Sequence, residues 1–463
     1  MADRAASRDP GSFRDPSNAV FHLDDRVLRG LDAQAHTDWK AVAGTDFFRQ
    51  AVARGQVVGT TEVDAALPGD WDGVLEHDRI PFRSYPYEWS FSMLQDAAIT
   101  HLELLAGAVE AGLTMADGTA YNVQWQGASP VFIDVLSFRP STGEPWAGYR
   151  QFCQTMLFPL LVQAHRGFPA RLLLRSHLEG IEPGHARRLL GPLGWTGKGV
   201  VRHVHLHALA DARLGGSGSS ALSKDLAEAG FGEKVAASLA AKLLELVRGL
   251  TWKPPKSGWT DYADACSLTP ADRDAKARFV RSALGDRHHR MVWDLGCNDG
   301  TYSRIAAERA DTVVAVDADE EVVDRLYRAR RAAGDRRILP LVLDLLDPSP
   351  GLGWRNRERA AFWDRGRPDV VLALALVHHL TLAGNVPLAD VVDWLASFGG
   401  EVVLEVPHRD DPMVQRLLSG KPSGTHDDYS LERFEALVAE HFTVQDRVAL
   451  PSGTRTILHL VHP

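Results

Sequence analysis

The sequence predicts an α/β protein with a doubly wound, mostly parallel sheet over residues 259–463 and a separate α+β domain over residues 19–205. In the C-terminal part, short apolar runs alternate with helical stretches, which is typical of a parallel sheet covered on both faces. A length of 463 residues allows two or three domains. Between the two domains, residues 206–258 contain the flexible run GGSGSS at 215–220 and predict a linker with one helical segment.

Six apolar runs in the C-terminal part have the length and composition of buried strands. In chain order they are Met291–Leu295, Thr312–Val316, Ile338–Leu343, Asp369–Leu374, Glu401–Val406 and Thr456–Val461. Ligands of such sheets bind beyond the carboxyl ends of the strands. The polar residues that end or follow these runs are therefore candidate site residues.

The N-terminal domain mixes helices and strands. Ser90–Gly112 and Ala147–Gln163 have the composition of helices, whereas Asn122–Trp125 and Pro130–Val135 predict two short strands around a glycine turn. Residues 1–18 are rich in Ser, Arg, Asp, Pro and Gly, and this composition predicts a disordered tail.

Charge and cysteine content narrow the classes of function. The 51 basic and 60 acidic residues leave a net charge of −9, so we expect no nucleic-acid partner, since phosphate binding needs a basic face. Three cysteines far apart in the chain argue against a disulfide scaffold and a cysteine-rich metal site, and they fit a reducing compartment. No run approaches the roughly 20 apolar residues of a membrane span, and no secretory signal is visible. We therefore expect a cytoplasmic protein without a membrane partner.

The strongest chemical signal is a glycine-rich turn after the first run. The segment Asp294-Leu-Gly-Cys-Asn-Asp-Gly300 precedes a helix, and its glycines allow a sharp turn and a close approach to a ligand. Asp317 ends the second run about 20 positions later, where an acid accepts hydrogen bonds from ribose hydroxyls. Asp344 and Leu345 follow the third run, where they can meet an adenine edge.

Two nucleoside cofactors compete for this arrangement. A dinucleotide site prefers G-x-G-x-x-G, with a pyrophosphate at the helix N-terminus. Here Asp294 would repel a phosphate, whereas an acid suits a ligand that carries a cationic α-amino group. The pattern therefore favours S-adenosylmethionine. A Rossmann-like domain that has lost its ligand is the alternative.

These motifs resemble those of class I S-adenosylmethionine-dependent methyltransferases, and the resemblance covers residues 291–461. It implies a Rossmann-like methyltransferase domain in which the loop glycines line the methionine portion, Asp317 holds the ribose and Asp294 orients the loop or the amino group. An aromatic residue before the first helix of related enzymes lies over the cofactor, a role open to Tyr262, which otherwise is a packing anchor. The cofactor-site residues are then Asp294, Gly296, Cys297, Asn298, Gly300, Asp317, Asp344, Leu345, Ala373, Leu374 and Tyr262, with Cys297 a space filler in the loop and Ala373 and Leu374 in the floor.

Across residues 20–463 the chain also resembles a narrower group, the nodulation-protein-related (NoeA-like) bacterial methyltransferases. The supporting stretches are YPYEWSFSML at 85–94, AYNVQ at 120–124, PVFID at 130–134, WTDY at 259–262 and DPMVQRLL at 411–418. This resemblance implies little about the substrate, because the group is better defined by sequence than by reaction.

Two histidines are candidate bases for the methyl transfer. The fourth run extends to Val377-His378-His379-Leu380 and lacks the N-P-P-Y type sequence associated with methylation of amide and base nitrogens. It therefore favours an oxygen acceptor, with His378 or His379 accepting its proton. The alternative is that one histidine caps the strand or packs under the next helix.

Glu405 and His408 end the fifth run and are expected to face the same crevice as the histidines. Both are candidate catalytic residues. For Glu405 the alternative is an ion pair with Arg409 or Arg416.

The N-terminal domain contains a second constellation. Asp117 and Asn122 have the D-x-x-x-x-N spacing of a kinase catalytic loop, and Asp134 follows two short strands, so the region resembles the C-lobe of a kinase-like phosphotransferase. However, Val-Leu follows Asp134 in place of Phe-Gly, and no G-x-G-x-x-G loop precedes it. Three interpretations stay open: a degenerate kinase fold that binds substrate or serves as a scaffold, an unrelated α+β domain, and an active phosphotransferase.

The sequence thus predicts an enzyme, an S-adenosylmethionine-dependent methyltransferase that O-methylates a small or conjugated bacterial metabolite, with the N-terminal domain framing the acceptor site. One alternative is a bifunctional or mainly phosphotransferring enzyme that uses ATP and magnesium at Asp117, Asn122 and Asp134. Another is a non-catalytic cofactor-binding partner in a larger assembly.

Overall fold

The structure, a computed structural model, describes residues 6–191, 203, 232–254, 268–422 and 424–463. The chain divides into two compact units. The first comprises Met1–Trp125, Pro130–Pro255 and Gly351–Ala360, and the second comprises Gln126–Ser129, Lys256–Pro350 and Ala361–Pro463. Two short segments group with the unit that does not contain their neighbours in the chain: Gln126–Ser129 with the second unit and Gly351–Ala360 with the first. The predicted order of domains along the chain does not include this exchange.

A seven-stranded sheet forms the core of the second unit, with the strand order β12-β11-β10-β13-β14-β16-β15. Strands β10 to β14 are mutually parallel, whereas β16 runs antiparallel to both β14 and β15. The predicted doubly wound sheet is confirmed. Its strands are β10 (His289–Leu295), β11 (Ala310–Asp317), β12 (Ile338–Val342), β13 (Val370–Ala373), β14 (Glu401–Pro407), β15 (Thr443–Ala449) and β16 (Arg455–Val461).

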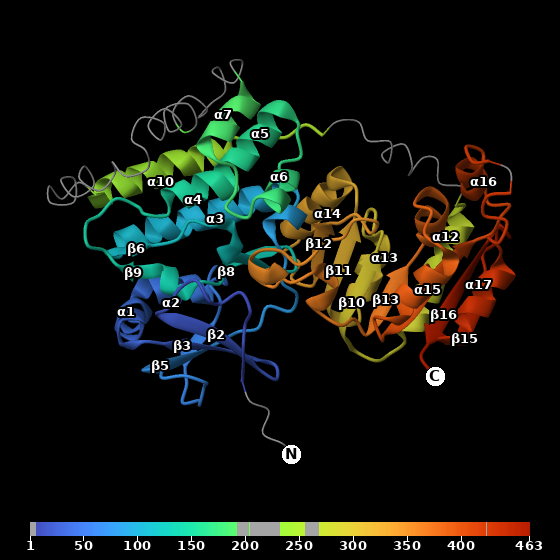
Figure 1. Ribbon diagram of the computed structural model, residues 1–463, viewed down its shortest axis with the longest axis horizontal. Coiled ribbons are helices and arrows are strands. Elements are labelled where there is room, and N and C mark those ends of the chain that lie inside the picture. Colours follow the sequence, from blue (N-terminus) through green and yellow to red (C-terminus); the bar gives the residue numbers. More distant parts are fainter. Residues whose placement is uncertain (1–5, 192–202, 204–231, 255–267, 423) are drawn as a thin grey trace. The chain divides into compact units, whose positions relative to one another are not determined.

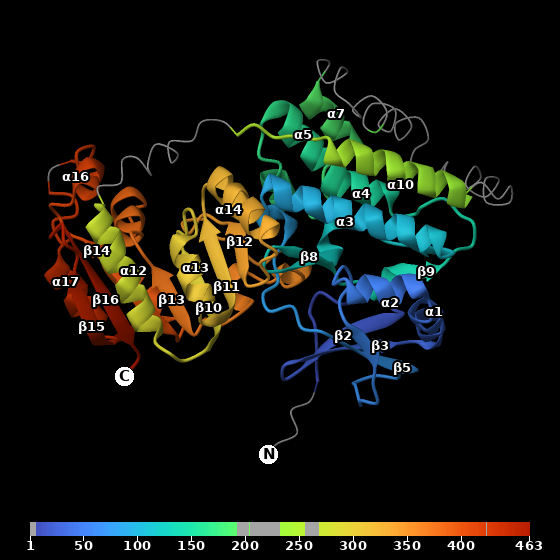
Figure 2. The same ribbon diagram turned by 180° about the vertical axis from the view of Figure 1, so that it is seen from behind.

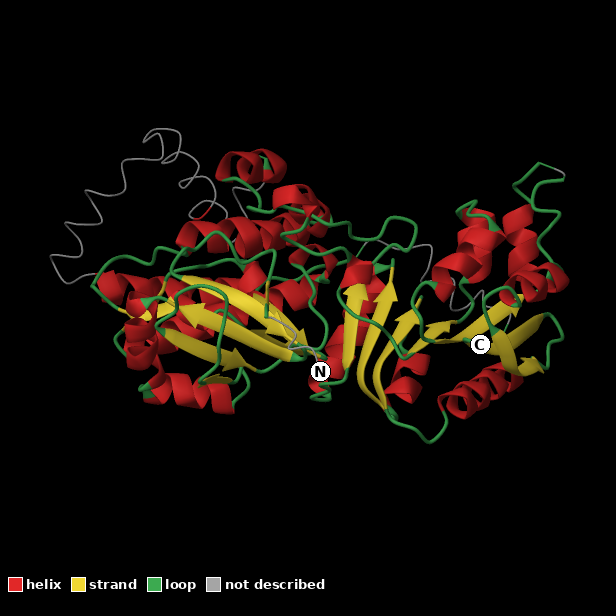
Figure 3. Ribbon diagram, turned by 60° about the horizontal axis from the view of Figure 1, so that its bottom comes forward, coloured by secondary structure: helices red, strands yellow, loops and turns green. Residues whose placement is uncertain are grey.

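Helices cover both faces of this sheet (Figure 3). Helices α15 and α17 lie on one face (Figure 1), and α12 lies on the other (Figure 2). The helices of this unit are α12 (Pro270–Leu284), α13 (Thr301–Ala307), α14 (Glu320–Ala332), α15 (Leu388–Ala396), α16 (Pro412–Leu418) and α17 (Leu431–Val438), with short turns η8 (Phe362–Asp364) and η9 (His379–Ala383). Because the parallel strands are buried on both faces, they consist of nearly continuous apolar residues, the pattern that predicted them.

The structure departs from the prediction at two strands of this sheet. Strand β15, at one edge, was not among the predicted runs, because its sequence TVQDRVA is polar and almost entirely exposed. Strand β13 ends at Ala373 and does not continue to Leu380. The positive φ of 52° at Ala375 turns the chain out of the strand, so His378 and His379 lie on the helical turn that follows.

The first unit begins with a five-stranded antiparallel sheet of order β1-β2-β3-β5-β4. Among the described residues of this unit, the strands are β1 (Ser7–Arg8), β2 (Asn18–Leu23), β3 (Arg26–Leu31), β4 (Thr60–Glu62), β5 (Gly73–His77), β6 (Leu113–Met115), β7 (Val123–Gln126), β8 (Ser129–Phe132) and β9 (Phe138–Pro140). The last four form two small two-stranded sheets, β6 with β9 and β7 with β8.

Helices make up the rest of the first unit. Helices α3 and α10 run side by side (Figure 1), and Gln95 on α3 donates to the carbonyl oxygens of Val247 and Leu250, at 2.7 and 2.9 Å. The helices and turns are α1 (Ala33–Ala43), α2 (Asp46–Ala53), η1 (Pro86–Glu88), α3 (Phe91–Glu110), η2 (Ala120–Asn122), η3 (Val135–Ser137), α4 (Tyr149–Phe152), η4 (Cys153–Leu157), α5 (Phe158–Arg166), α6 (Arg171–Ser176), α7 (Pro183–Leu190) and α10 (Gly232–Arg248). No helix within the described ranges is both long and apolar enough to cross a membrane.

Residues 6–18 are ordered, in contrast to the predicted disordered tail. Strand β1 pairs with β2, and Oδ2 of Asp9 lies 2.8 Å from Nε2 of His22 and 2.8 Å from Nη1 of Arg83. Burial by itself would raise the pKa of Asp9, but His22 and Arg83 hold it well below its usual range. These partners are distant in sequence, so composition could not reveal them. The run at 215–220 lies outside the described residues.

Polar contacts join Gly351–Ala360, which contains the turn η7 (Trp354–Asn356), to the first unit. The side chain of Glu358 is 2% exposed and accepts two hydrogen bonds from the guanidinium of Arg14, at 2.8 and 3.0 Å. The backbone N–H of Ala360 donates to the hydroxyl of Tyr85 at 3.0 Å. Tyr85 is the first residue of the stretch 85–94, one of those that carry the NoeA-like resemblance, and its hydroxyl accepts this hydrogen bond.

Candidate functional site at the carboxyl edge of the sheet

The carboxyl end of β10 leads through a tight loop into α13. Gly296, Asn298 and Gly300 have φ values of 78°, 47° and 71°, a region that glycine adopts without strain and that asparagine tolerates better than most residues. A Cβ atom at Gly300 would lie 2.6 Å from Leu326 on α14, so glycine at this position also allows α13 and α14 to pack closely. The loop has the sharp turn that the sequence predicts.

Asp294 lies beneath this loop and is 2% exposed. Its Oδ2 accepts a hydrogen bond from the hydroxyl of Ser303 at 2.5 Å. Burial raises the pKa of Asp294 to about 6, while the Ser303 hydrogen bond and the ammonium of Lys276 act in the opposite direction. The group is therefore largely ionised at pH 7, and a buried carboxylate here suits a cationic ligand group.

Asp317 ends β11 and ties this strand to the loop. Its two carboxylate oxygens accept hydrogen bonds from the backbone N–H groups of Asn298 and Asp319, both at 3.0 Å. Burial raises the pKa of Asp317, and the two N–H groups oppose that shift. A carboxylate offers about four acceptor positions, so capacity remains for a ribose hydroxyl.

Strand register brings the predicted cofactor residues to one edge of the sheet. Asp294 on β10 pairs with Leu372 on β13, and Asp317 on β11 pairs with Val342 on β12, two residues before Asp344. Because these strands are parallel and adjacent, their carboxyl ends meet at the same edge. The cofactor-site prediction therefore corresponds to neighbouring positions in the fold.

The remaining predicted cofactor residues differ in exposure. Asp344 is exposed, and its Oδ1 accepts from the backbone N–H of Leu346 at 2.9 Å, while Leu345 is partly buried. Ala373 and Leu374 are buried at the end of β13. Cys297 is buried, and burial raises the pKa of its thiol, so it stays protonated and serves as a small packing group. Tyr262 lies outside the described residues.

The two candidate histidines lie against each other, with ring centroids 4.1 Å apart. His378 is fully buried, and neither of its ring nitrogens has a hydrogen-bond partner within the described part of the chain. Burial lowers the pKa of His378 well below 6.5, and the charges of His379, Arg455 and Lys276 add to this effect. Burial likewise lowers the pKa of His379 to about 4. Both imidazoles are therefore neutral at pH 7 and weakly basic.

Glu405 lies within β14, fully buried, and its carboxylate is held by two cations that the sequence analysis did not single out. Lys276 on α12 binds Oε2, and Nη1 of Arg455 donates to Oε1 at 2.9 Å. Burial by itself would raise the pKa of Glu405, but Lys276 and Arg455 lower it overall. Glu405 therefore forms an ion pair, as the alternative interpretation predicted, but its partners are Lys276 and Arg455 and not Arg409 or Arg416. A carboxylate bound in this way is a poor proton acceptor.

His408 follows β14, and its Nε2 lies 2.9 Å from the Thr456 hydroxyl. Arg455 also binds Asp411, with Nε to Oδ2 at 2.7 Å and Nη2 to Oδ1 at 3.2 Å. One signal for Lys276 was present in the sequence: it falls four residues after Asp272 and three before Phe279, on the buried face of α12. Arg455 stands at the start of an apolar strand, and its sequence context identifies no partner.

In the first unit, the structure brings Asp117, Asn122 and Asp134 together and adds Arg29 from β3. Nη1 of Arg29 donates to Oδ1 of Asp134 at 2.8 Å, and Nδ2 of Asn122 donates to Oδ2 at 3.3 Å. Burial raises the pKa of Asp117, and the nearby charge of Asp134 adds to this. Both oxygens of Asp134 are thus engaged by the protein. No group of three His, Cys, Asp or Glu side chains within the described ranges could hold a metal ion.

We expect replacement of Arg29 with Met to destabilise the first unit. Side-chain exposure is 10% for Arg29 and 21% for Asp134, so the substitution leaves a largely buried carboxylate without its cation. Breaking such a pair costs about 3 kcal/mol. The measurement is urea unfolding of the full chain. The control is Arg26→Met, on the same strand β3 as Arg29, which removes an exposed ion pair with Glu76 and should unfold at a urea concentration close to that of the wild type. Equal losses of stability in both variants would contradict the role of burial.

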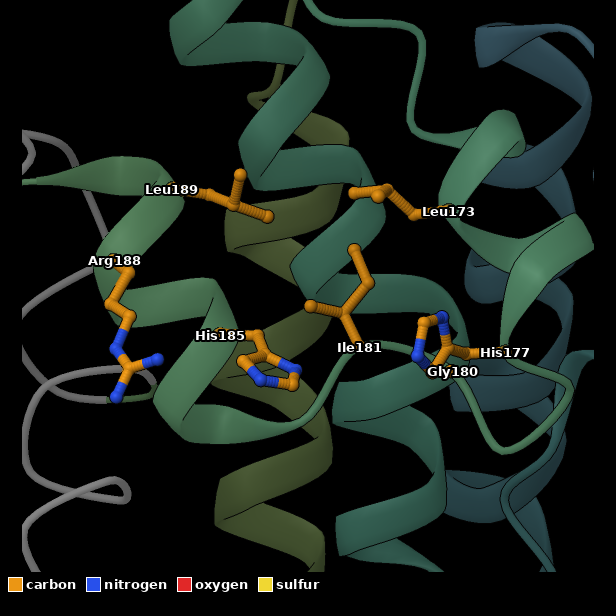
Figure 4. A pocket seen from close by; sticks show the side chains of 7 residues that line it. All are labelled: Leu173, His177, Gly180, Ile181, His185, Arg188 and Leu189. Atoms are coloured by element: carbon orange, nitrogen blue, oxygen red, sulfur yellow. The ribbon is translucent and has the colours of Figure 1, made fainter.

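A cavity of about 270 Å³ lies in the first unit beside α6 and α7 (Figure 4). Its lining includes Leu173, His177, Ile181, His185, Arg188 and Leu189. The rings of His177 and His185 are 6.5 Å apart, centroid to centroid. No predicted site residue is among those that line this cavity, so it is distinct from both constellations described above.

Comparison with known proteins places the chain in a family. The nodulation protein NoeA of Rhizobium meliloti (strain 1021) is 34% identical over 462 residues, which is 96% of this chain and 94% of that protein. No family model matches the chain.

Two solved structures are similar to part of the chain. The N-methyltransferase NodS of Bradyrhizobium japonicum WM9 with S-adenosyl-L-homocysteine is 14% identical, with 43% of this chain and 91% of NodS covered and a TM-score of 0.32. The magnesium protoporphyrin IX methyltransferase ChlM of Synechocystis PCC 6803 with bound SAM is 14% identical, with 46% and 87% covered and a TM-score of 0.30. Because the identity to NoeA extends over nearly the whole length of both chains, the chain belongs to the family of the NoeA nodulation protein.

Proposed function

We propose that this protein is an S-adenosylmethionine-dependent methyltransferase. One observation carries the proposal: a buried carboxylate, a tight glycine loop and a second carboxylate bound to the loop backbone lie at the carboxyl edge of a doubly wound sheet. Asp294, the loop from Gly296 to Gly300, and Asp317 supply these three parts. This is the edge at which sheets of this class bind nucleoside ligands.

The chemistry of these residues fits the cofactor. Bound S-adenosylmethionine supplies an electrophilic methyl group on its sulfonium. Asp294 would pair with the α-ammonium group, and Asp317 would accept from the ribose hydroxyls while it holds the loop through Asn298. Asp344 and Leu345 would flank the adenine. Positioning of the reacting groups then provides most of the rate enhancement, since methyl transfer is an in-line displacement.

For the acceptor, we propose an oxygen nucleophile on a small or conjugated bacterial metabolite. His378 and His379 are neutral at pH 7, the protonation state that a base requires, but their lowered pKa values make them weak proton acceptors. This weakness favours an acceptor that ionises readily, such as a phenol or a carboxylic acid, over an aliphatic alcohol. That residues 19–205 frame the acceptor site stays a prediction.

The alternatives differ in what they require of the site. A phosphotransferase would need Asp134 to bind magnesium, whereas its two oxygens are bonded to Arg29 and Asn122. Magnesium-dependent ATP turnover that Asp134→Ala removes would favour this alternative. A non-catalytic cofactor-binding partner would bind S-adenosylhomocysteine, transfer no methyl group to any acceptor and co-purify with a partner enzyme.

The test is a calorimetric titration of the full chain with S-adenosylhomocysteine, with wild type and Asp317→Ala side by side. We expect the wild type to bind and the variant to bind about 10- to 100-fold more weakly, because a hydrogen bond to a charged group contributes about 1.5–3 kcal/mol. The variant also frees the backbone N–H of Asn298, which loosens the loop.

Asp311→Ala is the matched control, since Asp311 lies at the opposite end of β11, where it pairs with the exposed His288. Its affinity should equal that of the wild type. If folded wild-type protein does not bind S-adenosylhomocysteine, the proposed cofactor is wrong. If Asp317→Ala binds as tightly as the wild type, the cofactor stands and the assignment of Asp317 falls.

A further inference from the structure

A buried lysine lies close to the proposed cofactor loop. Lys276 on α12 has a side chain that is only 3% exposed, and its ammonium is paired with the fully buried Glu405. The same ammonium lies 4.6 Å from the centre of the Tyr302 ring on α13. Lysine is almost never buried unless it is paired, so this position requires an explanation.

The neighbours of Lys276 connect it to Asp294. Tyr302 and Ser303 are consecutive residues of the first turn of α13, and Ser303 donates the 2.5 Å hydrogen bond to Asp294. The ammonium thus lies beside the turn that holds the carboxylate. Burial raises the pKa of Asp294. The negative charges of Asp317 and Asp299 raise this pKa further, and the cation Lys276 opposes all three effects.

We propose that Lys276 is a positioning residue of the cofactor site, whose ammonium keeps the Asp294 carboxylate charged and able to pair with the α-ammonium group of the cofactor. The inference rests on the proposed function, because that function assigns Asp294 to this group. It adds a residue from α12 to a site otherwise built from the loop and the strand ends.

The network around Glu405 holds this ammonium in place. Glu405 is shared between Lys276 and Arg455. Arg455 is in turn held by Asp411 at 2.7 Å. Four elements, α12, β14, β16 and the start of α16, therefore determine where the ammonium lies.

The direction in which cofactor affinity changes with pH follows from the charge state of Asp294. The carboxylate must be ionised to bind the cofactor's ammonium group, and its pKa is raised to about 6. Wild-type affinity should therefore be constant near pH 8 and fall as the pH drops through about 6. Removal of the Lys276 charge raises the pKa of Asp294, so affinity should begin to fall closer to neutral pH.

The experiment measures the affinity of the full chain for S-adenosylhomocysteine by calorimetry from pH 5.5 to 8.5. For Lys276→Met we expect an upward shift of the profile by about one pH unit, with about fivefold weaker binding at pH 6 and near-wild-type binding at pH 8.5. Lys276→Arg retains the charge and should restore the wild-type profile. Arg278→Met removes an exposed charge from the same helix and should change nothing.

A second variant keeps the test decisive if Lys276→Met does not fold. Lys276→Gln removes the positive charge but keeps an N–H donor for Glu405, so its profile should shift to higher pH as that of Lys276→Met does. A wild type that binds at no pH would overturn the proposed function itself. A wild type that binds, with a Lys276→Met profile that coincides with it or is weaker by the same factor at every pH, would overturn this inference alone.

Discussion

Arg455→Met should destabilise the second unit by about 3–5 kcal/mol, the usual cost of removing one partner from a buried ion pair. Arg455 is 1% exposed, and the two carboxylates that it binds, those of Glu405 and Asp411, are completely buried. After the substitution Glu405 retains Lys276, but Asp411 keeps only weaker partners, among them the hydroxyl of Thr454 at 3.3 Å. The main penalty therefore comes from the buried charge of Asp411.

Urea unfolding of the full chain measures this loss, and hydrogen exchange in peptides from β14 and β16 localises it. Arg447→Met on the adjacent strand β15 is the control: its pair with Glu435 is exposed, with side-chain exposures of 59% and 33%, and should contribute under about 1 kcal/mol. If Arg455→Met unfolds at the urea concentration of the control, the network does not stabilise the fold.

His101→Phe should make the first unit more resistant to acid. His101 is fully buried on α3 among Phe132, Trp146 and Phe152, with ring centroids 5.7 to 5.8 Å away. Neither ring nitrogen has a hydrogen-bond partner within the described residues. Burial lowers the pKa of His101 from 6.5 to about 3, so the folded protein holds this imidazole neutral.

The direction of the pH dependence follows from proton counting. Between about pH 3 and 6.5 the unfolded chain binds a proton at His101 that the folded chain does not bind, so folding stability falls as the pH is lowered through this range. At pH 5 the loss is about 2 kcal/mol relative to pH 7.5. Phenylalanine cannot take up the proton, and His101→Phe should therefore avoid this loss.

The informative quantity is the difference in unfolding free energy between His101→Phe and wild type, measured at pH 7.5 and again at pH 5. Any change in packing is present at both pH values, whereas the protonation effect appears only at the lower one. His185→Phe, at an exposed position of the same unit, is the control and should show no such pH-dependent gain. A difference that is constant with pH would show that His101 is not held neutral by the fold.

Local sequence was sufficient to predict the loop and the carboxylates at the carboxyl edge of the sheet. The order of run, glycine turn and acid predicted where β10 ends and which carboxylates follow, and strand register then placed Asp294 and Asp317 at one edge. This worked because parallel strands buried on both faces are continuous apolar runs, and the turns that follow them need glycine for backbone reasons. The exposed edge strand β15 has no such pattern and was missed.

The surroundings of the candidate catalytic residues were predicted less well, because the properties of these side chains depend on residues distant in sequence. His378 and His379 were placed on a strand, but they lie on the turn after Ala375, and burial makes them weak bases. The effective charge of Glu405 depends on Lys276 and Arg455, which lie 129 residues before it and 50 residues after it in the chain.

The amino-acid sequence thus specified the order of elements, the glycine loop and the two carboxylates at the carboxyl edge of the sheet, since these follow from local backbone chemistry and hydrophobic pattern. Tertiary structure decided which ionisable groups are charged. Burial and ion pairing shift pKa values by bringing together residues from different elements, as Lys276 and Arg455 do around Glu405. Such pairings leave no spacing pattern in the chain, and only the folded arrangement reveals them.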